Sequence, residues 1–114
     1  MAGKFELKLA KDGQYHFNLK AGNGQVILSS ELYRSKAAAE NGIASIQKNA
    51  ADENRFDRRE NKNGEPYFIL KAGNGQEIGR SEYYSGKAAM ENGIQSVMKN
   101  APDAKIEDTT IEAA

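Results

Sequence analysis

The side chains that could carry out catalysis or hold a metal are few in this sequence. Its 114 residues include one histidine, His16, and no cysteine. A serine or cysteine hydrolase needs a nucleophile, a base and an orienting group, and the base is usually a histidine. His16 aligns with Tyr67 in the internal repeat described below, so the second copy lacks it. We expect no catalytic residues, no metal site and no cofactor, and we predict that the protein is not an enzyme.

A polar pattern that occurs twice is the main candidate for a small-ligand, peptide or acid–base site. Ser-Glu-x-Tyr, followed closely by Lys-Ala-Ala-x-Glu-Asn-Gly-Ile, begins at residue 30 and again at residue 81. Serine, glutamate and tyrosine near a helix start also satisfy free backbone N–H groups, so a purely structural corner is the simpler interpretation. The candidate site residues are Glu31, Tyr33, Lys36 and Asn41, with their counterparts Glu82, Tyr84, Lys87 and Asn92.

Two identical glycine-rich segments admit two interpretations. Lys-Ala-Gly-Asn-Gly-Gln occupies residues 20–25 and 71–76. Backbone N–H groups in such loops could surround an anion such as phosphate. Neither segment matches a known phosphate motif, and each lies between expected strands, so Asn-Gly hairpin turns explain them better.

The overall charge gives no attraction toward nucleic acid or anionic lipid. Sixteen basic and sixteen acidic residues cancel, whereas affinity for phosphates requires several convergent cations. Weak nucleic-acid binding through the helix-start lysines, Lys36 and Lys87, stays as an alternative. Runs of bulky apolar residues such as 26–28 are too short to cross a bilayer. Together with the absence of cysteine, this favours a cytoplasmic protein without a membrane partner.

The chain consists largely of two copies of one unit, offset by 51 residues. Residues 17–50 align with residues 68–101, and 23 of these 34 pairs are identical. In the first copy, apolar residues concentrate in three short segments, 4–9, 15–20 and 26–28, and alternate with polar ones in the first two. This pattern predicts half-buried strands.

A helix is expected after the third strand of each copy. Ser35 can cap the first helix, and small or apolar residues then recur with helical spacing. Gly42 and Gly93 fall inside these stripes and are expected to let each helix approach the sheet or the other helix closely. Further short strands are expected at 55–60 and 105–110. The stripes comprise Ala39, Gly42, Ile43, Ile46 and Ala50 in the first helix, and Met90, Gly93, Ile94, Val97 and Ala101 in the second.

These elements predict an α+β fold. We expect two tandem βββα(β) repeats with pseudo-twofold symmetry, forming one antiparallel sheet of about seven strands with both helices on a single face. The first repeat should span residues 1–53 and the second, with its C-terminal strand, residues 54–114. Because the second copy supplies the pairing surface that a single copy would need from a partner, we expect a monomer.

The uncovered face of the sheet is the preferred candidate for a binding surface. Strand alternation is expected to place His16, Val26, Leu28, Tyr67 and Ile69 on it. A contiguous apolar patch there would mark a site for an unknown protein or peptide partner. The alternative is that sheet twist or the C-terminal segment covers these residues. Our working hypothesis is a non-enzymatic binding or accessory protein.

The combined motifs resemble those of the YegP-like family of small uncharacterised bacterial proteins. The resemblance is carried by the paired Lys-Ala-Gly-Asn-Gly-Gln hairpins and by the two polar motifs that follow each of them. It implies two β3-α-β units joined in one sheet, with their last strands exchanged. It implies no activity.

Overall fold

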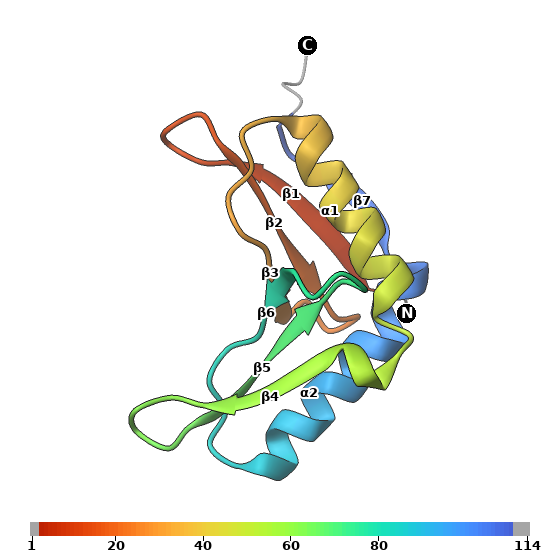
Figure 1. Cartoon of the computed structure of the whole chain (residues 1–114). Coiled ribbons are helices and arrows are strands. Elements are labelled where there is room, and N and C mark those ends of the chain that lie inside the picture. The colour runs from red at the N-terminus through yellow and green to blue at the C-terminus, as the bar shows by residue number, and fades with distance from the viewer. Residues whose placement is uncertain (1–2, 111–114) are drawn as a thin grey trace.

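The computed structural model describes residues 3–110 as one sheet covered on one side by two helices (Figure 1). The elements in chain order are β1 (Lys4–Leu9), β2 (Tyr15–Lys20), β3 (Val26–Ser29), α1 (Lys36–Asn49), the 3-10 turn η1 (Glu53–Arg55), β4 (Phe56–Glu60), β5 (Pro66–Lys71), β6 (Glu77–Arg80), α2 (Lys87–Asn100), the 3-10 turn η2 (Ala101–Asp103) and β7 (Lys105–Asp108).

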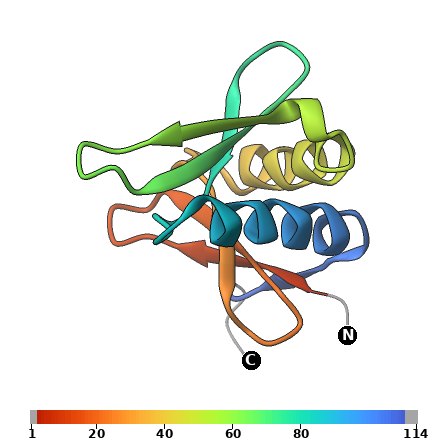
Figure 2. The same ribbon diagram turned by 90° about the horizontal axis from the view of Figure 1, so that it is seen from below.

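The seven strands follow the order β4-β5-β6-β3-β2-β1-β7. This confirms the predicted α+β fold with both helices on one face of a single sheet (Figure 2). The expectation that every strand pair is antiparallel was wrong for one pair, because β7 runs parallel to β1. The turn η2, which contains Pro102, delivers the chain to the start of β1, with Lys4 opposite Lys105. β7 can then pair only by running in the same direction as β1.

In the middle of the sheet, the two copies meet at one strand pair. β3 and β6 are antiparallel, and Ser29 lies opposite Arg80, its own counterpart at the 51-residue offset. The pseudo-twofold axis therefore passes through this pair. Each Ala-Gly-Asn-Gly hairpin also reaches the helix of the other copy, since Asn74 lies beside α1 and Asn23 beside α2. This contact gives a reason for the identity of the two hairpins.

The glycine hairpins are tight turns, as expected. In the first one, Gly24 N–H donates to the carbonyl oxygen of Ala21 at 2.9 Å, and Gly24 has φ 86°. The second hairpin repeats this geometry at Gly75, with φ 87°. Only the second glycine of each Gly-Asn-Gly has a positive φ, so the turn is a type I turn closed by a glycine bulge.

A β-bulge in the third strand of each copy moves one predicted surface residue into the core. Lys20 lies opposite Val26, but the preceding Leu19 lies opposite Leu28, so Ile27 is an extra residue. The extra residue reverses the alternation beyond it. Leu28 therefore packs in the core, only 1% exposed, and its predicted place on the uncovered face was wrong.

Each helix begins and packs much as the sequence indicates. The Ser35 side chain caps α1 by accepting a hydrogen bond from Ala38 N–H at 3.1 Å, while Gly86 stands at the same place in α2 without such a bond. The close approach at Gly42 is to an aromatic side chain: a Cβ at position 42 would lie 2.5 Å from Tyr33 Oη. Gly93 meets the hydroxyl of Tyr84 in the same way.

Candidate functional site

The two outer edges of the pseudo-symmetric sheet differ in what covers them. β1 belongs to the first copy and is flanked on its outer side by β7. The pairing continues beyond the strand, since Thr109 N–H donates to the carbonyl oxygen of Leu7 at 3.0 Å. An ion pair also joins Asp108 to Lys36 at the start of α1. Backbone and charge together hold β7 in place.

β4, the counterpart of β1, forms the outermost strand of the sheet among the described residues. A groove of about 560 Å³ lies beside it, between β4 and the first turns of α2. By the 51-residue offset, this groove corresponds to the place that the end of β7 fills in the first copy. The groove is lined by Arg58, Arg59, Glu60, Pro66, Lys87, Met90 and Glu91.

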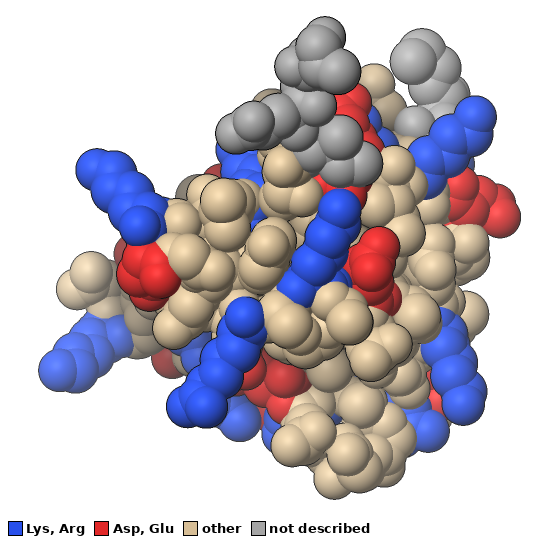
Figure 3. Space-filling model, turned by 90° about the horizontal axis from the view of Figure 1, so that it is seen from above, with Lys and Arg blue, Asp and Glu red and all other residues tan. Residues whose placement is uncertain are grey.

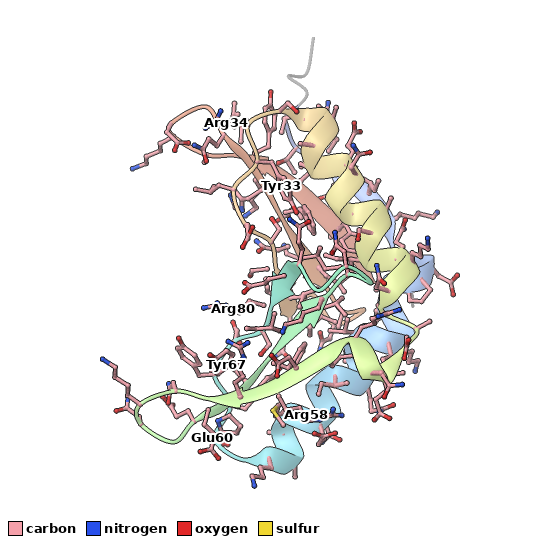
Figure 4. The ribbon with its side chains drawn as sticks, in the orientation of Figure 1. Tyr33, Arg34, Arg58, Glu60, Tyr67 and Arg80 are labelled. Atoms are coloured by element: carbon pink, nitrogen blue, oxygen red, sulfur yellow. The ribbon has the colours of Figure 1, made fainter. Side chains whose placement is uncertain are left out.

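The side chains of this groove combine an apolar base with charged walls. Pro66 and Met90 are buried and contribute the apolar part. Arg58 extends from β4 toward α2 (Figure 4), where its Nη2 lies 3.0 Å from Glu91 Oε1 and its Nε contacts the other oxygen. This two-point contact lowers the pKa of Glu91 and raises that of Arg58. Both groups are therefore charged over the whole physiological pH range.

Lys36 and Lys87 show how the two edges differ. Each is the first residue of its helix. The hydrogen bond from Lys36 holds the pKa of Asp108 at about 2, and the same contact raises the pKa of Lys36. Lys87 is exposed and makes no ion pair within residues 3–110. A cation at a helix N-terminus is opposed by the helix dipole, so Lys87 stands where an anion would be stabilising.

Sequence reasoning identified Lys87 but missed the rest of the groove. The signal was present in the alignment of the two copies. Arg58 stands at the position of the buried Leu7, and Met90 at that of Ala39. An arginine in place of a core leucine marks the point at which the symmetry of the copies ends.

The serines of the twice-occurring polar pattern form hydrogen-bonded corners. Ser30 Oγ accepts a hydrogen bond from Phe17 N–H at 2.8 Å and donates to the carbonyl oxygen of Glu31 at 2.8 Å. Ser81 makes the same two contacts, with Phe68 N–H at 2.9 Å. The geometry supports the structural interpretation for this part of the pattern.

The tyrosines of the pattern pack over the helices. Tyr33 stacks on Phe17 with ring centroids 6.0 Å apart, and Tyr84 stacks on Phe68 in the same manner. Partial burial raises the pKa of both phenols, and the nearby carboxylates of Glu31 and Glu82 add to this effect. Neither tyrosine is therefore poised to ionise near neutral pH.

The polar members of the pattern line several surface grooves. Glu31, Tyr33 and Asn41 border one groove of about 490 Å³ between α1 and the second glycine hairpin. Asn92 lies at a groove of about 380 Å³ beside the first hairpin, and Glu82 lies at another of about 380 Å³. The structure thus brings Glu31, Tyr33 and Asn41 of the first copy together at one groove, and divides their second-copy counterparts among several places.

The uncovered face is more polar than the sequence indicates. Besides the loss of Leu28 to the core, Ile69 is only 1% exposed, while Val26, His16 and Tyr67 are half-buried. Tyr67 lies edge-on to Tyr83, and the guanidinium of Arg80 lies 5.8 Å from the Tyr67 ring on the concave side (Figure 4). On this face, the residues that the structure describes form no exposed apolar patch of the predicted extent.

Two ion-pair clusters occupy that face instead. Glu6 lies 3.1 Å from both Lys20 and Lys8, whose hydrogen bonds lower its pKa. In the second copy, burial opposes ionisation of Asp57, but Arg59 and Lys71 outweigh it and lower the pKa of Asp57. These matched clusters pair two basic residues of each half with an acid, which favours a balanced surface over a cationic one on this face.

Charges are also mixed on the face seen from above. There, Lys and Arg side chains stand apart from one another with Asp and Glu side chains among them (Figure 3). Phosphate binding depends on several convergent cations, which this face does not offer in its described part. No helix within residues 3–110 has the length and apolar character needed to cross a membrane.

Comparison with known proteins gives consistent matches along the chain. A family model described as domain of unknown function DUF1508 matches residues 10–57 and again residues 61–108. UPF0339 protein MS1092 of Mannheimia succiniciproducens is 73% identical over 108 residues, which cover 95% of this chain and 96% of that protein.

Two solved structures share the fold. The solution NMR structure of UPF0339 protein SO3888 from Shewanella oneidensis has a TM-score of 0.89 at 51% identity, covering 95% of this chain and 92% of the other. The solution NMR structure of YegP from E. coli, described as a protein of unknown function, has a TM-score of 0.90 at 48% identity and covers 96% and 94%. These matches confirm the resemblance to YegP-like proteins, and none of these descriptions states an activity.

Proposed function

We propose that this chain, which belongs to the DUF1508 family of unknown function, is a non-enzymatic binding protein that holds an extended peptide segment along the outer edge of β4. One observation carries the proposal. The same edge in the first copy is occupied by a strand, β7, whereas no strand formed by residues 3–110 covers the outer edge of β4, which has an adjoining groove of about 560 Å³. The fold thus contains both an occupied and an unoccupied version of one strand-binding edge.

Strand addition at an open edge is an established way of binding peptides. The backbone of the edge strand supplies affinity, and pockets beside it select side chains. Leu7 presents its carbonyl oxygen to β7, so the same group of Arg58 is expected to face outward from β4. Each backbone hydrogen bond formed there contributes about 0.5–1.5 kcal/mol net.

The charges on β4 determine which segments can pair with it. Asp57, Arg58, Arg59 and Glu60 give the strand four consecutive charged residues. Charged side chains on an edge strand discourage pairing with the apolar edges of other proteins. They also restrict productive pairing to a segment of complementary charge, which favours selective binding.

Selection of peptides by the full-length chain, followed by a pair of matched variants, tests the proposal. A display library of random ten-residue peptides is selected on the wild-type protein. Enriched peptides are then measured against Arg58→Pro and Arg58→Ala. Both substitutions remove the guanidinium, but only proline also removes the outward N–H, which has no partner in β5.

We expect Arg58→Pro to bind enriched peptides about tenfold more weakly than Arg58→Ala, because a backbone hydrogen bond is lost. Backbone NMR should also show slower amide exchange at Arg58 once peptide is bound. If the selection enriches no peptide, or if bound peptides protect amides elsewhere and bind both variants equally, the proposal is refuted.

A further inference from the structure

The contacts of β7 with the first copy indicate which side chains the open edge of β4 would recognise. Two consecutive acidic residues of β7 contact two cations on opposite faces of the sheet. Glu107 Oε2 lies 3.0 Å from Lys4 Nζ, and Asp108 pairs with Lys36. Neighbouring side chains of a strand point to opposite faces, so the two contacts hold the strand from both sides.

Both cations have basic counterparts in the second copy, but only one of them lies at the groove beside β4. At the 51-residue offset, Arg55 stands for Lys4 and Lys87 stands for Lys36. Arg55 is turned toward α1 and the second glycine hairpin, where its guanidinium lies beside Gly73, whereas Lys87 lines the β4 groove and has no ion pair among residues 3–110. The second copy therefore retains the helix-side cation of the strand site in the absence of the acidic strand.

On the basis of the proposed function, we infer that the β4 edge binds an acidic segment running parallel to β4, with one carboxylate directed to Lys87. The register follows from the first copy, where Phe5 lies opposite Ile106 and Leu7 opposite Asp108. In the second copy, Arg58 lies opposite the residue whose carboxylate meets Lys87. The N–H of the following residue then donates to the carbonyl oxygen of Arg58, as Thr109 does to Leu7.

The surroundings of Lys87 strengthen this assignment. Lys87 lies at the first turn of the 14-residue helix α2, whose dipole favours a negative charge at that end. Glu91 lies one turn further along but is engaged by Arg58. A carboxylate from the peptide would thus meet one free ammonium group, the helix N-terminus and the apolar surface of Pro66 and Met90.

The probe for this inference is a fluorescein-labelled peptide, Ala-Lys-Ile-Glu-Asp-Thr-Thr, which repeats the sequence of residues 104–110. Its affinity for the full-length protein is measured by fluorescence anisotropy. A second peptide has Gln and Asn in place of the two acids. An exposed ion pair is worth up to about fivefold in affinity, so the neutral peptide, which cannot form the pair with Lys87, should bind about three- to fivefold more weakly. The difference should shrink at high salt.

Protein variants locate the contact at Lys87. Lys87→Ala should weaken the acidic peptide about three- to fivefold and leave the neutral peptide unchanged. Lys99→Ala, which removes an exposed lysine from the last turn of the same helix, is the matched control and should have no effect. Lys87→Glu should regain affinity for a peptide that carries Lys at the aspartate position.

Three results would overturn the inference. The first is equal binding of the acidic and neutral peptides, which leaves the proposed function intact if both protect the Arg58 amide. The second is protection of β1 amides in place of β4 amides, since the probe would then have displaced β7. The third is failure of the acidic probe to bind, and in that case the library selection decides whether the β4 edge binds peptides at all.

Discussion

Replacement of Gly42 by alanine should destabilise this protein, although alanine is the better helix former. A glycine inside a helix costs about 1 kcal/mol relative to alanine, so the change alone would be stabilising. A Cβ at this position would however lie 2.5 Å from Tyr33 Oη and 2.9 Å from Tyr33 Cζ. The tyrosine ring is stacked on Phe17 at 6.0 Å and cannot move without losing that contact.

The expected magnitude follows from these opposing effects. Overpacking of a fitted contact costs about 1–3 kcal/mol, and the short separation favours the upper part of this range. After subtraction of the helix gain, Gly42→Ala should lower the free energy of unfolding by about 1–2 kcal/mol. In a Tyr33→Ala background the obstacle is gone, and the same change should be neutral or stabilising by up to about 1 kcal/mol.

The wild type, Gly42→Ala, Tyr33→Ala and the double variant form a double-mutant cycle. Their unfolding in urea is followed by far-UV circular dichroism, and the slope of the unfolding free energy against urea concentration should be the same for all four. Ala44→Gly, at an exposed position of the same helix, calibrates the local cost of glycine. The second copy offers a replicate at Gly93 and Tyr84. Equal effects of Gly42→Ala in both backgrounds, or a more stable single variant, would refute the packing argument.

Three further outcomes are expected. Ser81→Ala should lower the unfolding free energy by about 1–3 kcal/mol in urea, because a buried backbone N–H loses its acceptor; an unchanged midpoint would contradict this. Asp108 has a folded-state pKa of about 2, below the ordinary value of 3.8, so its contribution to stability is present above about pH 4 and lost as the pH falls toward 2. Asp108→Asn should therefore flatten the acid loss of stability in pH-dependent unfolding, and a parallel shift of the whole curve would argue against the Lys36 contact. Leu28→Asp should prevent folding, as judged by circular dichroism, whereas Val26→Asp should be tolerated. If Val26→Asp prevented folding and Leu28→Asp did not, the assignment of the bulge to Ile27 would be wrong.

The repeating parts of the fold were predictable because their signals are local. Alternating residues such as Phe5, Leu7, Phe17 and Leu19 indicate strands whatever lies next to them, and all four are buried as expected. The capping role of Ser35 is equally local, since the bond to Ala38 spans three residues. The duplication then allowed each local prediction to be made twice.

The remaining features depend on residues far apart in the chain. The bulge at Ile27 is decided by the register between two strands, and a single extra residue moved Leu28 to the core. The parallel pairing of β7 depends on where the turn η2 places the start of β7 relative to β1. The β4 groove exists because Arg58 and Met90 break the symmetry of two otherwise similar halves. Periodicity alone carries none of this information.

The pairing of β7 with β1 has a consequence for biosynthesis. Leu7 and Thr109, which share a backbone hydrogen bond, are separated by 102 residues. Ribosomes add residues from the N-terminus at a limited rate, so the outer edge of β1 stays uncovered until residues 105–109 have been synthesised. A nascent chain consequently carries an unprotected strand edge throughout the synthesis of the residues that separate β1 from β7.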